Sequence, residues 1–74
     1  MIGELDRVVL TAELPEYGLE AGDVGTVVLV HQNGEGYEVE FVTLDGETVA
    51  VISLFDTQLR AIGRGEIAQA RVMA

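Results

Sequence analysis

The chain of 74 residues contains no cysteine, a single proline and only four aromatic residues. Without cysteine, neither a disulfide nor a thiolate zinc site can stabilise so short a chain, so an apolar core must hold the fold unaided. Grooves that bind proline-rich peptides need several aromatic side chains. Tyr17 could supply one, but Tyr37 and Phe41 are expected in the core, and the alternative is that Tyr17 anchors its own loop against the domain.

Lysine is also missing, and the four arginines face thirteen acidic residues, which gives a net charge of -9. Proteins that grip duplex DNA make about 6 to 10 phosphate contacts through cationic side chains. Four arginines cannot supply that number, so we expect no nucleic-acid partner and no anionic membrane surface. The acidic balance either serves solubility alone or steers the approach of a basic protein partner.

Long apolar runs are missing as well. Every apolar stretch is far shorter than the roughly 20 residues that a membrane-spanning helix needs, and no basic-then-apolar leader pattern opens the chain. These features predict a cytoplasmic protein.

Short β-type segments separated by turn signals fill most of the sequence, and eleven valines favour pleated structure. Within residues 37–43, Tyr37, Val39 and Phe41 alternate with Glu38 and Glu40, the period of a strand with one buried face. We expect strands at residues 7–12, 24–32, 37–43, 48–54 and 59–62. A long loop at 14–23, turns at 33–36 and at Asp45-Gly46, and one helical turn at 55–58 connect them.

This order of elements predicts an all-β fold, namely a small five-stranded SH3-like barrel over residues 1–62. Short, strongly twisted strands curl readily, and partial closure removes sheet edges that would otherwise template aggregation. Residues 63–74 form a C-terminal tail that is either helical or disordered. Helical spacing of Ile67, Arg71 and Val72 supports the first alternative.

Several segments carry a family resemblance. They include Leu14-Pro15-Glu16-Tyr17-Gly18-Leu19, Gly22-Asp23-Val24-Gly25-Thr26-Val27-Val28 and Tyr37-Glu38-Val39-Glu40-Phe41. Together they resemble a family of small bacterial proteins catalogued as domain of unknown function 4926, over roughly residues 5–62. The resemblance implies an SH3-like fold and an antitoxin or immunity role, and it assigns no catalytic residue. The second segment is also similar to KOW-type domains, but Glu20 and Asp23 stand where those domains carry RNA-binding cations.

No catalytic, cofactor or metal site is predicted. His31 and Ser53 are the only histidine and serine, too few for a nucleophile, base and orienting acid. The acidic residues around the first loop, Glu13, Glu16, Glu20 and Asp23, match no calcium-loop spacing and are expected to form a solvated face.

Two of the predicted strands are apolar on both faces. In residues 24–32, Val28 and Val30 are expected in the core, which leaves Val27 and Leu29 outside. A small barrel has one interior, so the tail, a second copy of the chain or a partner must cover the other face. We therefore predict a non-catalytic protein-binding module whose contact residues are Tyr17, Val27, Leu29, Val42, Glu38 and Glu40. The alternative is an accessory subunit packed within a larger enzyme complex.

Overall fold

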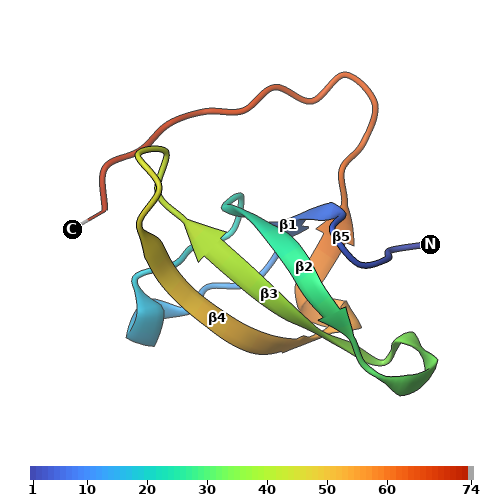
Figure 1. Cartoon of the computed structure of the whole chain (residues 1–74). Helices are drawn as coiled ribbons and strands as arrows, with labels where there is room; N and C mark the ends of the chain where they lie inside the picture. Colours follow the sequence, from blue (N-terminus) through green and yellow to red (C-terminus); the bar gives the residue numbers. More distant parts are fainter. Residues whose placement is uncertain (74) are drawn as a thin grey trace.

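The computed structural model describes residues 1–73 and places five strands in one antiparallel sheet (Figure 1). The strands are β1 (Arg7–Leu10), β2 (Val24–Val30), β3 (Gly36–Val42), β4 (Thr48–Phe55) and β5 (Leu59–Ala61). Three short 3₁₀ turns, η1 (Pro15–Tyr17), η2 (Gln32–Gly34) and η3 (Asp56–Gln58), lie in the connections. The chain is therefore all-β, as predicted.

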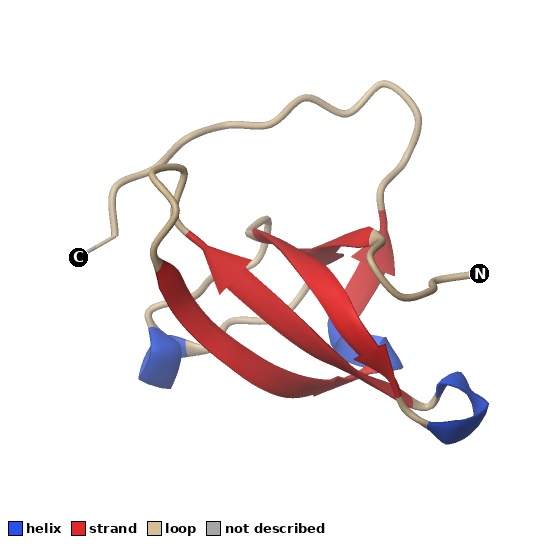
Figure 2. Ribbon diagram, in the orientation of Figure 1, coloured by secondary structure: helices blue, strands red, loops and turns tan. Residues whose placement is uncertain are grey.

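The strand order across the sheet is β4-β3-β2-β1-β5. The elements follow the order predicted for an SH3-like barrel (Figure 2): five strands, with a long first loop, two hairpins and a helical turn before the last strand. The sheet is curved but not closed, because β4 and β5 are its two edges and are joined only through η3. The closure is thus partial, and β4 keeps a free side.

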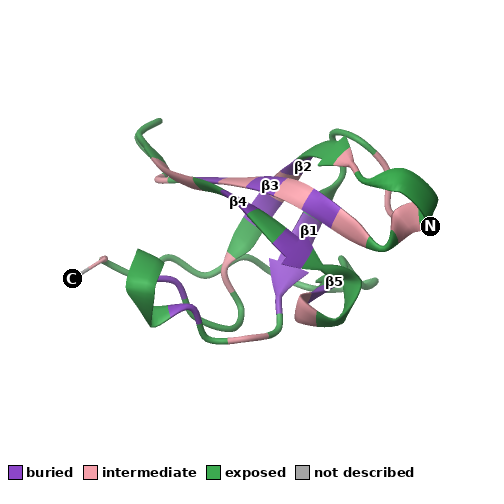
Figure 3. Ribbon diagram, turned by 90° about the horizontal axis from the view of Figure 1, so that it is seen from below, coloured by how far each residue is buried: buried purple, intermediate pink, exposed green. Residues whose placement is uncertain are grey.

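The core lies inside the curve of the sheet. Tyr37, Val39 and Phe41 are buried there, while Glu38 and Glu40 between them point to the other face, so the predicted alternation of β3 is confirmed. Buried and exposed positions also alternate along the second half of β4 (Figure 3). The remaining members of the core come from all the other strands and the first loop: Val8, Leu10, Leu14, Leu19, Val27, Ile52, Leu54 and Leu59.

The two hairpin connections differ in detail from their predicted form. Asn33 and Gly34 have φ values of 68° and 67°, as the turn signal required, but the connection contains the 3₁₀ turn η2. The β3–β4 loop is longer than the expected two residues. It closes with a hydrogen bond from the Thr43 N–H to the Glu47 carbonyl at 2.8 Å. Gly46, with φ of 95°, supplies the left-handed position in that loop.

The tail contains no helix within residues 63–73, so the helical alternative is wrong for this part of the chain. It leaves β5 and runs back across the sheet in an extended arch to the side of η1 (Figure 1). No helix among residues 1–73 has the length and apolar character needed to cross a membrane.

Candidate functional site

The convex side of the sheet, which we call the outer face, carries several of the residues that sequence patterning marked for binding. Strand register shows which side chains are neighbours on it. Glu38 pairs with Leu29 on β2 and with Ser53 on β4, and Glu40 pairs with Thr26 and Val51. Directly opposite residues on paired strands share a face of the sheet. The structure therefore brings Leu29, Glu38 and Glu40 together.

Val27 does not belong to this face. The β2–β3 register shifts between Val27 and Leu29, so a β-bulge at Val28 interrupts the alternation. Val27 is fully buried opposite Val39, whereas Val28 and Leu29 are both exposed. The predicted placement of Val27 outside and Val28 in the core is wrong for this reason.

Tyr17 is also separate from the outer face. It ends η1 in the first loop, where the Tyr17 N–H donates to the Leu14 carbonyl at 3.0 Å and the side chain is partly exposed. No hydrogen bond or strand pairing connects it to Leu29, Glu38 or Glu40.

Glu38 is the best-connected carboxylate of the outer face. Its Oε2 accepts a hydrogen bond from the Ser53 hydroxyl and lies 2.7 Å from Nε2 of His31. The Ser53 bond, and then the His31 bond, hold the pKa of Glu38 below its usual range. Since Ser53 donates to Glu38 and not to the imidazole, His31 is not placed to take its proton, and the three residues do not form the relay of a serine hydrolase.

Exposed apolar side chains surround Glu38 and Glu40. Phe55 is 70% exposed, Val51 is 52% exposed and Leu29 is similarly open. We call Leu29, Glu38, Glu40, Val51, Ser53 and Phe55 the open half of the outer face. Apolar side chains standing together around a few oriented polar groups are typical of a contact surface.

The other half of the outer face lies under the tail. Val9 pairs with Val24 on one side and Arg60 on the other, so its side chain shares the outer face with theirs. It is nevertheless only 8% exposed and is not a member of the core cluster. We call Val9, Val24, Arg60 and the overlying residues 63–73 the strapped half.

Two arginine pairs hold the tail across this half. Near its start, Arg60 donates to both carboxylate oxygens of Glu66, at 2.8 and 2.6 Å. These bonds and the Gly63 N–H lower the pKa of Glu66 to about 2. Near the far end, Arg71 donates to both oxygens of Asp23, at 2.8 and 2.6 Å, and to the Gly18 carbonyl at 3.0 Å.

The electrostatics of the far pair favour the charged state of both groups. Partial burial raises the pKa of Asp23, but the hydrogen bonds from Arg71 and the Glu20 N–H outweigh it and leave that pKa below its usual value. The same contact raises the pKa of Arg71. Met73 then packs against the core beside Gly18.

A groove of about 960 Å³ remains between the tail and the sheet. Its lining includes Val9, Val24 and Val42 from the sheet and residues 66–71 of the tail. Val42, predicted as a contact residue, thus lies at the border between the strapped half and the rest of the outer face.

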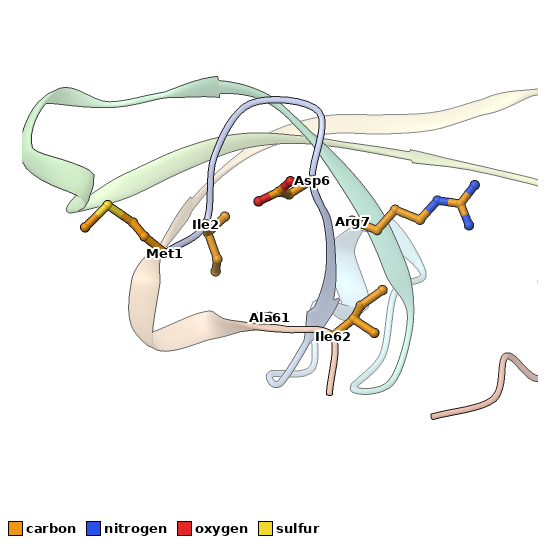
Figure 4. Close-up of a pocket in the computed structure, with 6 residues that line it drawn as sticks. All are labelled: Met1, Ile2, Asp6, Arg7, Ala61 and Ile62. Atoms are coloured by element: carbon orange, nitrogen blue, oxygen red, sulfur yellow. The ribbon is translucent and has the colours of Figure 1, made fainter. Parts of the chain in front are cut away.

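A smaller hollow of about 290 Å³ lies at the N-terminus (Figure 4). Met1, Ile2, Ala61 and Ile62 line it, and the Arg7 side chain points away from Met1 and Ile2. Asp6 is its only carboxylate, and no cluster of three potential metal ligands occurs anywhere in residues 1–73.

Two acidic residues around the first loop accept hydrogen bonds from backbone N–H groups of that loop. Glu13 accepts from the Ala21 N–H at 2.9 Å, and Asp23 accepts from the Glu20 N–H at 2.8 Å.

Comparison with protein families matches residues 4–61 to one described as Domain of unknown function (DUF4926). No curated protein and no solved structure matches the chain. The matched region contains the whole sheet and ends where the tail begins.

Proposed function

The chain belongs to the DUF4926 family, and we propose that it is a non-catalytic module that binds a basic protein through the open half of its outer face. The predicted resemblance to this family is confirmed, but a family of unknown function supplies no activity. The proposal is therefore argued from the surface alone, since one fold hosts many functions.

The observation that carries the proposal is the exposure of Leu29, Val51 and Phe55 around the hydrogen-bonded Glu38 carboxylate. Leaving a large apolar side chain in water forgoes about 1.5–3 kcal/mol relative to full burial. Three such side chains, on β2 and β4 at either side of β3, form a patch whose burial against a partner would be favourable.

The charge of the molecule supports a basic partner. The net charge is -9, and Glu38 and Glu40 stand within the apolar patch itself. Glu38 is ionised at neutral pH, and its lowered pKa keeps it charged further into the acidic range. A cationic protein would be steered toward this surface, and an antitoxin or immunity role that neutralises a basic enzyme fits this chemistry.

Pull-down from the native host, followed by co-expression with neighbouring genes, tests the proposal. The bait is the wild-type chain beside the double variant Leu29→Ser/Phe55→Ser, and Leu44→Ser is the matched control because Leu44 is exposed in the β3–β4 loop. We expect wild type and control to retain one basic protein and the double variant to lose at least tenfold in affinity. Recovery of the bait alone, or of nucleic acid, would refute the proposal.

A second candidate is an accessory subunit of a larger enzyme complex. The apolar character of the exposed residues Val28, Leu29, Val42, Val51 and Phe55 favours it, since permanent interfaces are more apolar than transient ones. Gene neighbourhood separates the candidates: a metabolic operon favours the subunit, and a toxin-like neighbour favours the neutralising module.

A further inference from the structure

The outer side of β4 is a free sheet edge, and the ladder shows which backbone groups it presents. The Asp56 N–H donates to the Glu35 carbonyl at 3.3 Å, which makes this a hydrogen-bonded pair. Hydrogen-bonded and non-hydrogen-bonded pairs alternate in an antiparallel ladder. Leu54, Ile52 and Ala50 therefore bond to β3, while Val51 and Ser53 direct their N–H and C=O groups away from it.

Neighbouring contacts agree with this assignment. The His31 N–H donates to the Gly36 carbonyl at 2.9 Å, so even-numbered residues of β3 face β2 and odd-numbered ones face β4. The Phe55 N–H, which also points away from β3, is taken by the Gln58 side chain at 2.8 Å. The N–H and C=O groups of Val51 and Ser53 therefore remain free to bond to an added strand.

Nothing within β4 protects this edge. The strand reads Thr-Val-Ala-Val-Ile-Ser-Leu-Phe and contains no charge, proline or glycine. Sheet edges are normally protected by charges, proline or a covering element, and an uncharged edge rich in β-branched residues is a template for strand addition.

Charges at both ends of β4 decide which strand can be added. Asp45 and Glu47 precede the strand, Asp56 follows it, and Glu35 lies beside Asp56. All four are exposed, and none pairs with a cation in the described part of the chain. A second copy pairing in either direction would place acidic end against acidic end, whereas a strand flanked by lysine or arginine would meet opposite charge at both ends.

We propose that the basic partner docks by adding an extended segment to the free edge of β4, with an apolar centre beside Val51 and Ser53 and cationic residues at its ends. This inference rests on the proposed function and specifies how that surface is used. Side chains of the added strand would continue the row formed by Val51, Ser53 and Phe55 on the open half.

Selection from a display library of random twelve-residue peptides tests the docking mode without knowledge of the natural partner. Peptides selected on the wild-type chain are measured against Val51→Pro and Val51→Thr. Proline is tolerated on an edge strand where the missing N–H faced solvent, so Val51→Pro removes an edge donor and Val51→Thr preserves it. Hydrogen exchange of the Val51 and Ser53 amides in wild type is the second readout, independent of whether Val51→Pro folds.

We expect selected peptides rich in β-branched residues with lysine or arginine at both ends. They should bind Val51→Pro at least tenfold more weakly than Val51→Thr and slow exchange at the two amides. A different result would refute the edge mode but keep the proposed function: basic peptides that lose affinity with Phe55→Ser but leave the Val51 and Ser53 amides unprotected. Such peptides would bind the open half through side chains alone. Selection of acidic peptides, or of none, would refute both.

Discussion

The two halves of the outer face are built from similar strands but differ in their exposure to solvent. On the strapped half, Val9 is almost buried although it points away from the core; it stands between Val24 on β2 and Arg60 on β5 and lines the groove beside the tail. On the open half, Val51 likewise points to the outer face, but it is half exposed. The same residue type is thus nearly buried in one half and exposed to solvent in the other.

The difference between the halves comes from where the tail is anchored. Arg71 reaches Asp23 at the start of β2, and Arg60 holds Glu66 above β5, so the tail crosses only that end of the sheet. On β3 and β4 the tail reaches only as far as the groove lined by Val42 and Val49, and Val51 and Phe55 stay exposed. A small domain with one curved sheet can in this way stabilise one patch and leave another free.

The largest expected effect is a difference in the free energy of unfolding between alanine variants of Val9 and Val51. Val9→Ala removes two methyl groups from a nearly buried site and should lower the free energy of unfolding by about 2 kcal/mol. Val51→Ala should change it by less than about 0.5 kcal/mol, because about half of the residue's surface is already in water. Urea or thermal unfolding measures both, and equal losses would mean that the two halves do not differ in burial.

A smaller effect is expected from releasing the far end of the tail. Arg71→Gln removes both bonds to Asp23, so residues 67–73 should become mobile and the melting temperature should fall slightly. Amide relaxation by NMR reports the mobility. Arg64→Gln is the charge-matched control, and comparable loosening in that variant would argue against a specific latch.

Acid should loosen the near end of the tail. The pKa of Glu66 is about 2 in the folded chain, against an ordinary value of 4.5. Since the folded pKa is the lower one, the contribution of this carboxylate is complete above pH 4.5 and is lost as the pH falls toward 2.

NMR titration of the Glu66 carboxyl and the Gly63 amide measures this transition, and Glu66→Gln should abolish the response of the amide. A Glu66 midpoint near 4.5 would show that the Arg60 pair does not hold the tail in solution.

The smallest effect on stability is expected at the centre of the open half. Phe55→Ser should leave the free energy of unfolding within about 0.5 kcal/mol of wild type while reducing the binding of a hydrophobic dye such as ANS. A large loss of stability would place Phe55 in the structural core instead of a contact surface.

Local pattern predicted much of the fold. The period of two in residues 37–43 placed Tyr37, Val39 and Phe41 inside and Glu38 and Glu40 outside, because a pleated strand with one buried face permits no other arrangement. Turn residues marked the ends of the strands for the same local reason, with Asn33, Gly34 and Gly46 adopting positive φ.

The site was predicted only in part. Leu29, Glu38 and Glu40 lie together as expected, but Val27 was assigned to the wrong face because a run of valines and leucine gives no sign of the bulge at Val28. Val51, Ser53 and Phe55 were missed, although the absence of any charge between Glu47 and Asp56 could have marked them.

By itself, the sequence determined the all-β class, the positions of the strands and the acidic character, since these depend on neighbouring residues and on composition. Tertiary structure alone decided which edge stays open, which face of β2 is buried and where the tail lies. Those outcomes depend on strand pairing and on contacts such as Arg71 with Asp23, which join residues 48 positions apart and leave no periodic signal in the chain.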